Sequence, residues 1–138
     1  MLRPRGRFLF SVWHRIEDNE FAACVTDALA AMFPEDPPRF LARTPHGYYE
    51  PEEIRADLTA AGFTRVSVEG VEHRSRAPSA RDVAVAYCQG TPLRSEIEAR
   101  DPSRLDEATE RAAQAVAAAF GTGAVDGRIR ALVVIAED

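Results

Sequence analysis

Arg5-Gly-Arg-Phe-Leu-Phe-Ser-Val-Trp13 is the stretch that decides the fold. A glycine followed by apolar, aromatic and β-branched residues is typical of a buried strand. The chain turns polar at His14 and Arg15, which predicts a loop at the end of that strand. Ligands of α/β proteins bind at the carboxyl ends of strands. We therefore expect a strand that opens an α/β sheet and places Trp13, His14 and Arg15 at its ligand-facing end.

The composition is that of an ordinary globular chain. Its 138 residues are 46% hydrophobic and 28% charged, with a net charge of -5. The arginines are spread along the chain, which argues against a nucleic-acid partner. The apolar run after the basic start is only about six residues, too short for a membrane span or a signal sequence. Cys24 and Cys88 lack disulfide or metal spacing, so we expect free thiols and a cytoplasmic protein.

The first half predicts a strand–helix–helix–strand unit over residues 1–74. Asp18-Asn19 is typical of a helix cap and Pro34 of a helix end. Pro51 suits the first turn of a second helix, and Gly62 its end. The alternating run 63–69 predicts the next strand.

The second half predicts a helical insertion over residues 75–127 and a closing strand over 128–138, all within one domain. Ser79 and Asp101-Pro102 are typical starts of two helices. Gly121-Thr-Gly123 predicts a helix end, and Asp126-Gly127 a turn. The run 129–136 is apolar at consecutive positions, which favours a central strand buried on both faces.

Three segments together resemble the C-terminal part of Rossmann-like S-adenosylmethionine-dependent methyltransferases. They are Leu2-Arg-Pro-Arg-Gly-Arg-Phe-Leu-Phe10, Ala61-Gly-Phe-Thr-Arg-Val66 and the closing strand 129–136. Arg5 stands where that family has the first of two glycines. The resemblance implies the family's fifth, sixth and seventh strands, with the seventh antiparallel between the other two. We therefore expect an α/β fold with a small three-stranded mixed sheet, ordered first–last–middle, and about four helices.

The resemblance also implies an acceptor pocket at the end of the first strand. Side chains from three segments are expected to line this pocket. The alternatives to a binding role are purely structural: packing over the core, a core tyrosine, a helix-end glutamine and plain loop chemistry. These candidates are Trp13, His14, Arg15, His46, Tyr48, Tyr49, Tyr87 and Gln89. No residue is assigned as the catalytic base.

The family's cofactor contacts have no counterpart in these 138 residues. A glycine-rich loop between strand and helix would bind the methionine carboxylate, and an acidic residue would bind the ribose. Gly121-Thr-Gly123 follows a helix, so it is no substitute. His14, His46 and His73 lack carboxylates at ligand spacing, so no metal site is expected. We expect no cofactor for this chain alone, although the intact family uses S-adenosylmethionine.

Two functional hypotheses follow. The first is the substrate-side portion of a methyltransferase, inactive alone, whose cofactor-binding half is lost, separate or encoded upstream. The second is a non-catalytic, dimeric interaction or small-ligand-binding module; an unrelated enzyme with an accidental resemblance is a third reading. Because an open apolar edge invites pairing, we expect a homodimer through Phe8 to Trp13, or a missing half that covers this strand.

Overall fold

The computed structural model describes residues 2–138 and contains one three-stranded sheet. Its strands are β1 (Arg7–Trp13), β2 (Arg65–Ala77) and β3 (Val125–Glu137). The order is β1-β3-β2, which confirms the predicted order and the central place of the last strand. Both hydrogen-bonded ladders are antiparallel, so the sheet is antiparallel where a mixed one was expected: β1 and β2 run in the same direction, but β3 lies between them and they do not pair with each other.

Six α-helices, where about four were expected, accompany the sheet in the described residues. The additional ones are the short α2 and α5. The helices are α1 (Glu20–Met32), α2 (Phe40–Arg43), α3 (Pro51–Ala60), α4 (Ala80–Gly90), α5 (Leu93–Arg100) and α6 (Leu105–Phe120), with 3-10 turns η1 (Ile16–Asp18) and η2 (Pro102–Arg104).

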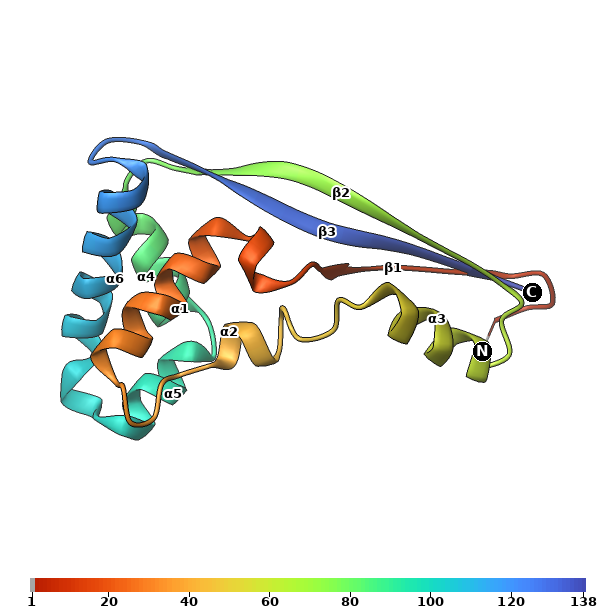
Figure 1. Ribbon diagram of the computed structural model, residues 1–138, viewed down its shortest axis with the longest axis horizontal. Helices are drawn as coiled ribbons and strands as arrows, with labels where there is room; N and C mark the ends of the chain where they lie inside the picture. The colour runs from red at the N-terminus through yellow and green to blue at the C-terminus, as the bar shows by residue number, and fades with distance from the viewer. Residues whose placement is uncertain (1) are drawn as a thin grey trace.

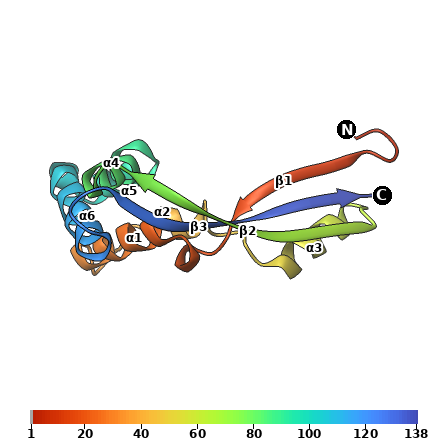
Figure 2. The same ribbon diagram turned by 90° about the horizontal axis from the view of Figure 1, so that it is seen from above.

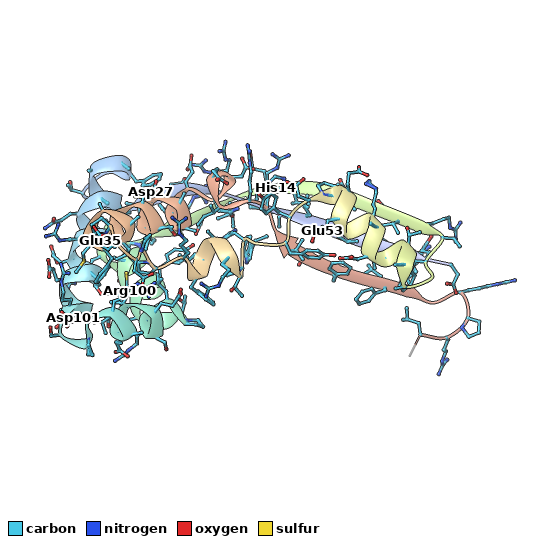
Figure 3. All side chains as sticks on the ribbon, turned by 60° about the horizontal axis from the view of Figure 1, so that its bottom comes forward. His14, Asp27, Glu35, Glu53, Arg100 and Asp101 are labelled. Atoms are coloured by element: carbon cyan, nitrogen blue, oxygen red, sulfur yellow. The ribbon has the colours of Figure 1, made fainter. Side chains whose placement is uncertain are left out.

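The molecule is elongated, with the helices divided between its two ends (Figure 1). The helices α1, α2, α4, α5 and α6 gather at one end of the sheet, whereas α3 lies along the strands at the other end, near both termini. β2 and β3 join the two ends, because each has 13 residues and so extends for about 40 Å. His14 lies at the junction between the two parts (Figure 3).

Two separate hydrophobic cores correspond to these two ends. The smaller packs Ile54 and Leu58 of α3 against the β3 residues Leu132, Val134 and Ala136. The larger lies among the other helices and takes in Val125, the first residue of β3; its buried members also include Phe21, Val25, Leu29, Val83, Ala84, Cys88, Leu93, Ile97, Ala108, Ala112 and Val116.

Opposite faces of β3 serve the two cores. Successive strand residues point to opposite faces, so the even-numbered Leu132 and Val134 meet α3 while the odd-numbered Val125 and Gly127 meet α1. The right-handed twist of strands rotates these faces along the ribbon. β2 and β3 accordingly cross in Figure 2, and both groups of helices lie on the same side of the molecule in Figure 1.

The ribbon is longer than the sequence pattern predicted. β2 continues past residue 69 to Ala77, and Asp126-Gly127, predicted as a turn, lies inside β3. Asp126 accepts hydrogen bonds from Arg74 and Arg76 of the neighbouring strand. Gly127 is needed because a Cβ there would lie 2.9 Å from Cε1 of Phe21. Cross-strand pairing therefore overrides the local turn preference, and the helical insertion spans 78–124.

Most of the predicted helix ends are confirmed. Ser79 caps α4 by accepting a hydrogen bond from the Asp82 amide, and Asp101 caps η2 through the Ser103 amide. Gly62 and Gly121, with φ of 101° and 110°, follow α3 and α6 in conformations that favour glycine. Asn19 is the exception, because its side chain makes no capping bond to α1 and binds the sheet instead.

β1 is an edge strand with an open side. Among residues 2–138, β3 is its sole strand partner. Phe8, Leu9 and Trp13 are 42%, 59% and 43% exposed. On the face that carries Leu9 and Trp13, the β3 residues Val133 and Ile135 are also only partly buried. The closing strand is thus buried on one face near α3, where burial on both faces was expected.

Candidate functional site

Two hollows flank Trp13 at the carboxyl end of β1. We call the first the aromatic hollow; it measures about 380 Å³ and lies between the sheet and the helices. The second, the edge hollow, measures about 360 Å³ and is lined by Ser11, Val12, Trp13, Thr44, Pro45, Tyr48 and Ala131. The aromatic hollow is lined by Trp13, Asn19, Phe40, Leu41, Pro45, His46, Tyr87, Gly90, Thr91, Pro92 and Ile129.

Trp13 is the last residue of β1 and pairs with Ala131 of β3. Its ring lies with its centroid 6.0 Å from that of His46, at an interplanar angle of 43°. The open face of the sheet leaves the indole 43% exposed. A large apolar ring in this position forms a wall shared by both hollows.

His46 is the best-defined polar side chain of the aromatic hollow. It is 5% exposed, and its Nδ1 lies 2.8 Å from the carbonyl oxygen of His14. Since a carbonyl only accepts, Nδ1 carries the proton and Nε2 of the neutral ring carries a lone pair. Burial lowers the pKa of His46, against the smaller effect of the hydrogen bond to His14 and the charge of Glu17. The ring is therefore neutral at pH 7.

The loop that carries His46 depends on a close backbone approach after α2. The His46 amide donates to the Leu41 carbonyl at 3.0 Å. A Cβ on Gly47 would lie 2.0 Å from the Arg43 carbonyl oxygen, so only glycine fits there. The loop 44–49 thus has a physical reason for its glycine.

Asn19 fixes the floor of the aromatic hollow. Its side-chain amide donates to the carbonyls of His14, Arg15 and Arg130 at 3.3, 3.1 and 3.3 Å, and its Oδ1 accepts from the Arg130 amide at 3.1 Å. Next to it, Glu20 accepts from the Arg128 amide at 2.7 Å. The start of α1 thereby occupies the edge of β3 beyond the end of β1.

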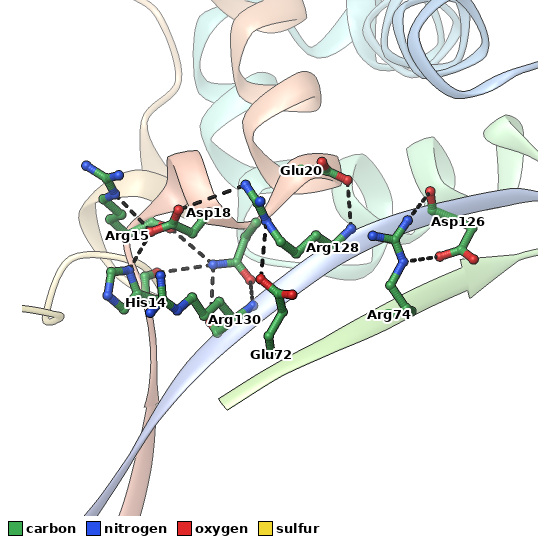
Figure 4. A network of polar contacts seen from close by, with 10 residues as sticks. His14, Arg15, Asp18, Glu20, Glu72, Arg74, Asp126, Arg128 and Arg130 are labelled. Atoms are coloured by element: carbon green, nitrogen blue, oxygen red, sulfur yellow. Dashed lines mark hydrogen bonds and ion pairs between the residues drawn. The ribbon is translucent and has the colours of Figure 1, made fainter. Parts of the chain in front are cut away.

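His14 and Arg15 turn away from both hollows and join an ion-pair network with η1 (Figure 4). His14 Nδ1 and Arg15 Nε lie 2.7 and 2.8 Å from Oδ2 of Asp18. Burial disfavours the Asp18 carboxylate, but the Arg15 hydrogen bond and nearby positive charges prevail and lower its pKa. The structure therefore gives these two predicted site residues a role in holding the loop after β1.

Figure 4 also shows ion pairs between arginines and carboxylates that join β2 to β3. Arg74 Nε lies 2.8 Å from Oδ1 of Asp126, and Arg128 Nε lies 3.9 Å from Oε1 of Glu72. Arg76 Nε also lies 3.2 Å from Oδ2 of Asp126, so this carboxylate holds two arginines of β2 against β3.

The predicted tyrosines separate into different places. Tyr48 lines the edge hollow and donates to Asp57 of α3 at 2.6 Å; this hydrogen bond, with burial and nearby carboxylates, raises the pKa of Tyr48 to about 12. Tyr49 lies against His14, with centroids 6.1 Å apart. Tyr87 of α4 lines the aromatic hollow, and burial raises its pKa.

Gln89 lies outside the hollows. Its side-chain amide donates to the Thr109 hydroxyl at 3.0 Å and joins α4 to α6. Of the eight predicted site residues, Trp13, His46 and Tyr87 come together in one hollow. The sequence analysis missed Asn19, Phe40 and Thr91 as lining residues; the Gly90-Thr-Pro92 helix end was the available signal for the last.

The described residues fit neither a metal nor S-adenosylmethionine. No group of three or more His, Cys, Asp or Glu side chains within residues 2–138 is placed to hold a metal ion. Gly121 follows α6 and Gly123 precedes β3, and a Cβ on either would meet only open space, so these glycines form no cradle.

Burial raises the pKa of the Cys88 thiol to about 11, which leaves it protonated and unreactive.

Neither protein-family models nor curated proteins show a match to the chain. The methyltransferase resemblance therefore depends on the three segments quoted above. Within residues 2–138, none of the helices has the length and apolar character needed to cross a membrane.

Proposed function

We propose that the chain is the substrate-side, C-terminal portion of a Rossmann-like S-adenosylmethionine-dependent methyltransferase and that it is inactive alone. The strand order β1-β3-β2, with β3 antiparallel to both neighbours, supports this proposal because it is the order that the resemblance implies. The position of the hollows at the carboxyl end of β1 adds support, since ligands of α/β sheets bind at such ends.

The open side of β1 is the observation that carries the proposal. A strand with Phe8, Leu9 and Trp13 exposed is an unusual sheet edge, because exposed apolar edges promote aggregation. Further strands beyond β1, with helices over the face of Leu9 and Trp13, would bury this surface. A larger α/β sheet provides both.

The contribution of this chain would be to bind and orient the methyl acceptor. Trp13, Tyr87 and the buried His46 line a hollow in which they would contact a small molecule. Orientation of the reacting groups supplies much of the rate in group transfer. No general base is assigned, because no acceptor has been identified.

The experiment tests the cofactor half directly. The chain alone and the product of the coding sequence extended upstream of Met1 would each be titrated calorimetrically with S-adenosylmethionine. The proposal predicts no binding to the chain alone at millimolar cofactor and saturable binding to the extended product. Absence of binding by the extended product, with no strand–glycine-loop–helix unit encoded beside this gene, would contradict it.

The alternative is a non-catalytic homodimer that pairs through β1. The His14 amide donates to the Arg130 carbonyl, and alternation along an antiparallel ladder directs the amides of residues 8, 10 and 12 to β3 as well. The amides of Leu9, Ser11 and Trp13 therefore point to the open side. Two β1 strands related by a twofold axis would satisfy them and form a six-stranded sheet.

A further inference from the structure

We propose that the aromatic hollow binds a small, uncharged aromatic molecule whose O–H or N–H group donates a hydrogen bond to Nε2 of His46. Its identification as the methyl acceptor rests on the proposed function, whereas the binding itself does not. The argument uses the fixed tautomer of His46, the charge of the lining and the shape of the walls.

The tautomer of His46 sets the polarity of the contact. Its Nδ1 donates to the His14 carbonyl, and residues 2–138 provide no hydrogen-bond partner for Nε2. Within the described residues, Nε2 is not among the buried side-chain atoms that lack a hydrogen-bond partner, which are His14 Nδ1 and Arg128 Nε, so it remains accessible to a molecule in the hollow. Because Nε2 of the neutral ring is an acceptor, the ligand group that satisfies it must be a donor.

The other polar groups of the lining are largely occupied. Asn19 uses its carboxamide on three backbone carbonyls and one backbone amide. The Thr91 hydroxyl donates to the Tyr87 carbonyl at 2.7 Å and accepts from the Leu93 amide at 3.1 Å. His46 Nε2, the Tyr87 hydroxyl and the Trp13 indole N–H are thus the side-chain groups of the lining left without a hydrogen bond within residues 2–138; of these, only Nε2 is purely an acceptor.

The walls select an uncharged ring. No lining residue is Asp, Glu, Lys or Arg, so a buried carboxylate or ammonium group would lose its hydration without gaining an ion pair. Trp13, Phe40 and Tyr87 supply aromatic surfaces, and Leu41 and Ile129 supply aliphatic ones. A volume of about 380 Å³ is at the small end of ligand sites and suits one or two rings.

The experiment uses toluene and three para-substituted toluenes as probes, with binding followed by NMR of the full chain. The probes are p-cresol, with a donor, 4-methylanisole, with an acceptor only, toluene, with neither, and 4-methylbenzoate, with a charge. p-Cresol is expected to bind roughly three- to tenfold more tightly than 4-methylanisole or toluene. The Trp13 indole resonance should shift with p-cresol, 4-methylanisole and toluene, whereas the His46 Nε2 resonance should shift mainly with p-cresol. The charged 4-methylbenzoate should bind most weakly.

His46→Asn is the matched variant. The asparagine amide keeps an N–H donor near the position of Nδ1 and removes Nε2, so the preference for p-cresol over 4-methylanisole should disappear while toluene binding is retained. Equal binding of p-cresol and 4-methylanisole by the wild type, failure of all the probes to bind, or shifts confined to other surfaces would overturn the proposal. These wild-type readouts do not require the variant to fold.

The binding assay contains no S-adenosylmethionine, so its failure is distinguishable from failure of the proposed function. Cofactor binding by the extended product without p-cresol binding would overturn this ligand class alone. p-Cresol binding without cofactor binding by the extended product, and with no strand–glycine-loop–helix unit encoded beside this gene, would support this site and contradict the methyltransferase proposal.

Discussion

The Asn19 carboxamide pairs with both backbone polar groups of Arg130, as a neighbouring strand would. Oδ1 accepts from the Arg130 amide at 3.1 Å, and Nδ2 donates to the Arg130 carbonyl at 3.3 Å. The same Nδ2 holds the carbonyl of His14, which accepts from His46. One residue, 1% exposed, therefore connects the edge of β3, the start of α1 and the candidate site.

Asn19→Ala is expected to destabilise the fold by about 1–3 kcal/mol, because the Arg130 amide loses its partner and the carbonyls of His14, Arg15 and Arg130 each lose one of two donors. Chemical denaturation followed by circular dichroism measures this change. Gln114→Ala is the control, since Gln114 makes an exposed contact within α6 and its loss should cost less than about 0.5 kcal/mol. Equal stability of the two variants would show that the Asn19 contacts are not structural.

Gly127→Ala is expected to destabilise the junction of β3 and α1 by about 1–3 kcal/mol through overpacking. The new methyl group would lie 2.9 Å from the ring of Phe21, which is 2% exposed. Gly123→Ala is the matched control, because a Cβ there meets open space. Thermal unfolding measures both variants, and Phe21→Leu should recover part of the loss in the double mutant. A Gly127→Ala protein as stable as wild type would contradict the close contact.

The His46 ring is expected to titrate below its ordinary pKa of 6.5, because burial favours the neutral form. The unfolded chain then binds a proton that the folded chain does not as the pH falls below 6.5. The stability associated with neutral His46 is therefore complete above pH 6.5 and is lost as the pH falls toward the folded pKa. Imidazole resonances followed by NMR between pH 4 and 8 measure the pKa. A His46 pKa at or above 6.5 would contradict the claim that burial favours the neutral ring.

Pairing through β1 predicts a homodimer at high micromolar concentration, measured by light scattering. Ser11→Pro removes an amide that points to the open side, so it should yield a monomer while leaving the ladder to β3 intact. Ser11→Ala keeps that amide and should remain dimeric. A wild-type monomer, or a Ser11→Pro dimer, would exclude this mode of pairing.

The central place of the last strand could be predicted because the apolar character of each residue in a run can be read directly from the sequence. The apolar run that includes Leu132, Val134 and Ala136 is the most continuous in the chain, and the structure makes it central. The lengths of β2 and β3 could not be predicted in the same way. Asp126-Gly127 has turn chemistry, but Arg74 and Arg76 across the ladder and Phe21 from α1 decide its conformation.

The sequence predicted several individual residues of the candidate site, but it did not predict which of them come together. Trp13, His46 and Tyr87 were each identified within their own segment, but their meeting depends on the packing of α2 and α4 beside the end of β1. His14 and Arg15 have the right position for a site, yet Asp18 draws both into an ion-pair network. The role of Asn19 was hidden because a cap and a strand-edge contact require the same short polar side chain.

Calorimetric titration with S-adenosylmethionine tests the central claim most directly, applied to the chain alone and to the product extended upstream. We predict no heat of binding for the chain alone and saturable binding with one cofactor per chain for the extended product. Saturable binding to the chain alone would contradict the claim that the cofactor half lies elsewhere. No binding to either, with no strand–glycine-loop–helix unit encoded beside this gene, would contradict the methyltransferase proposal and leave the dimeric binding module.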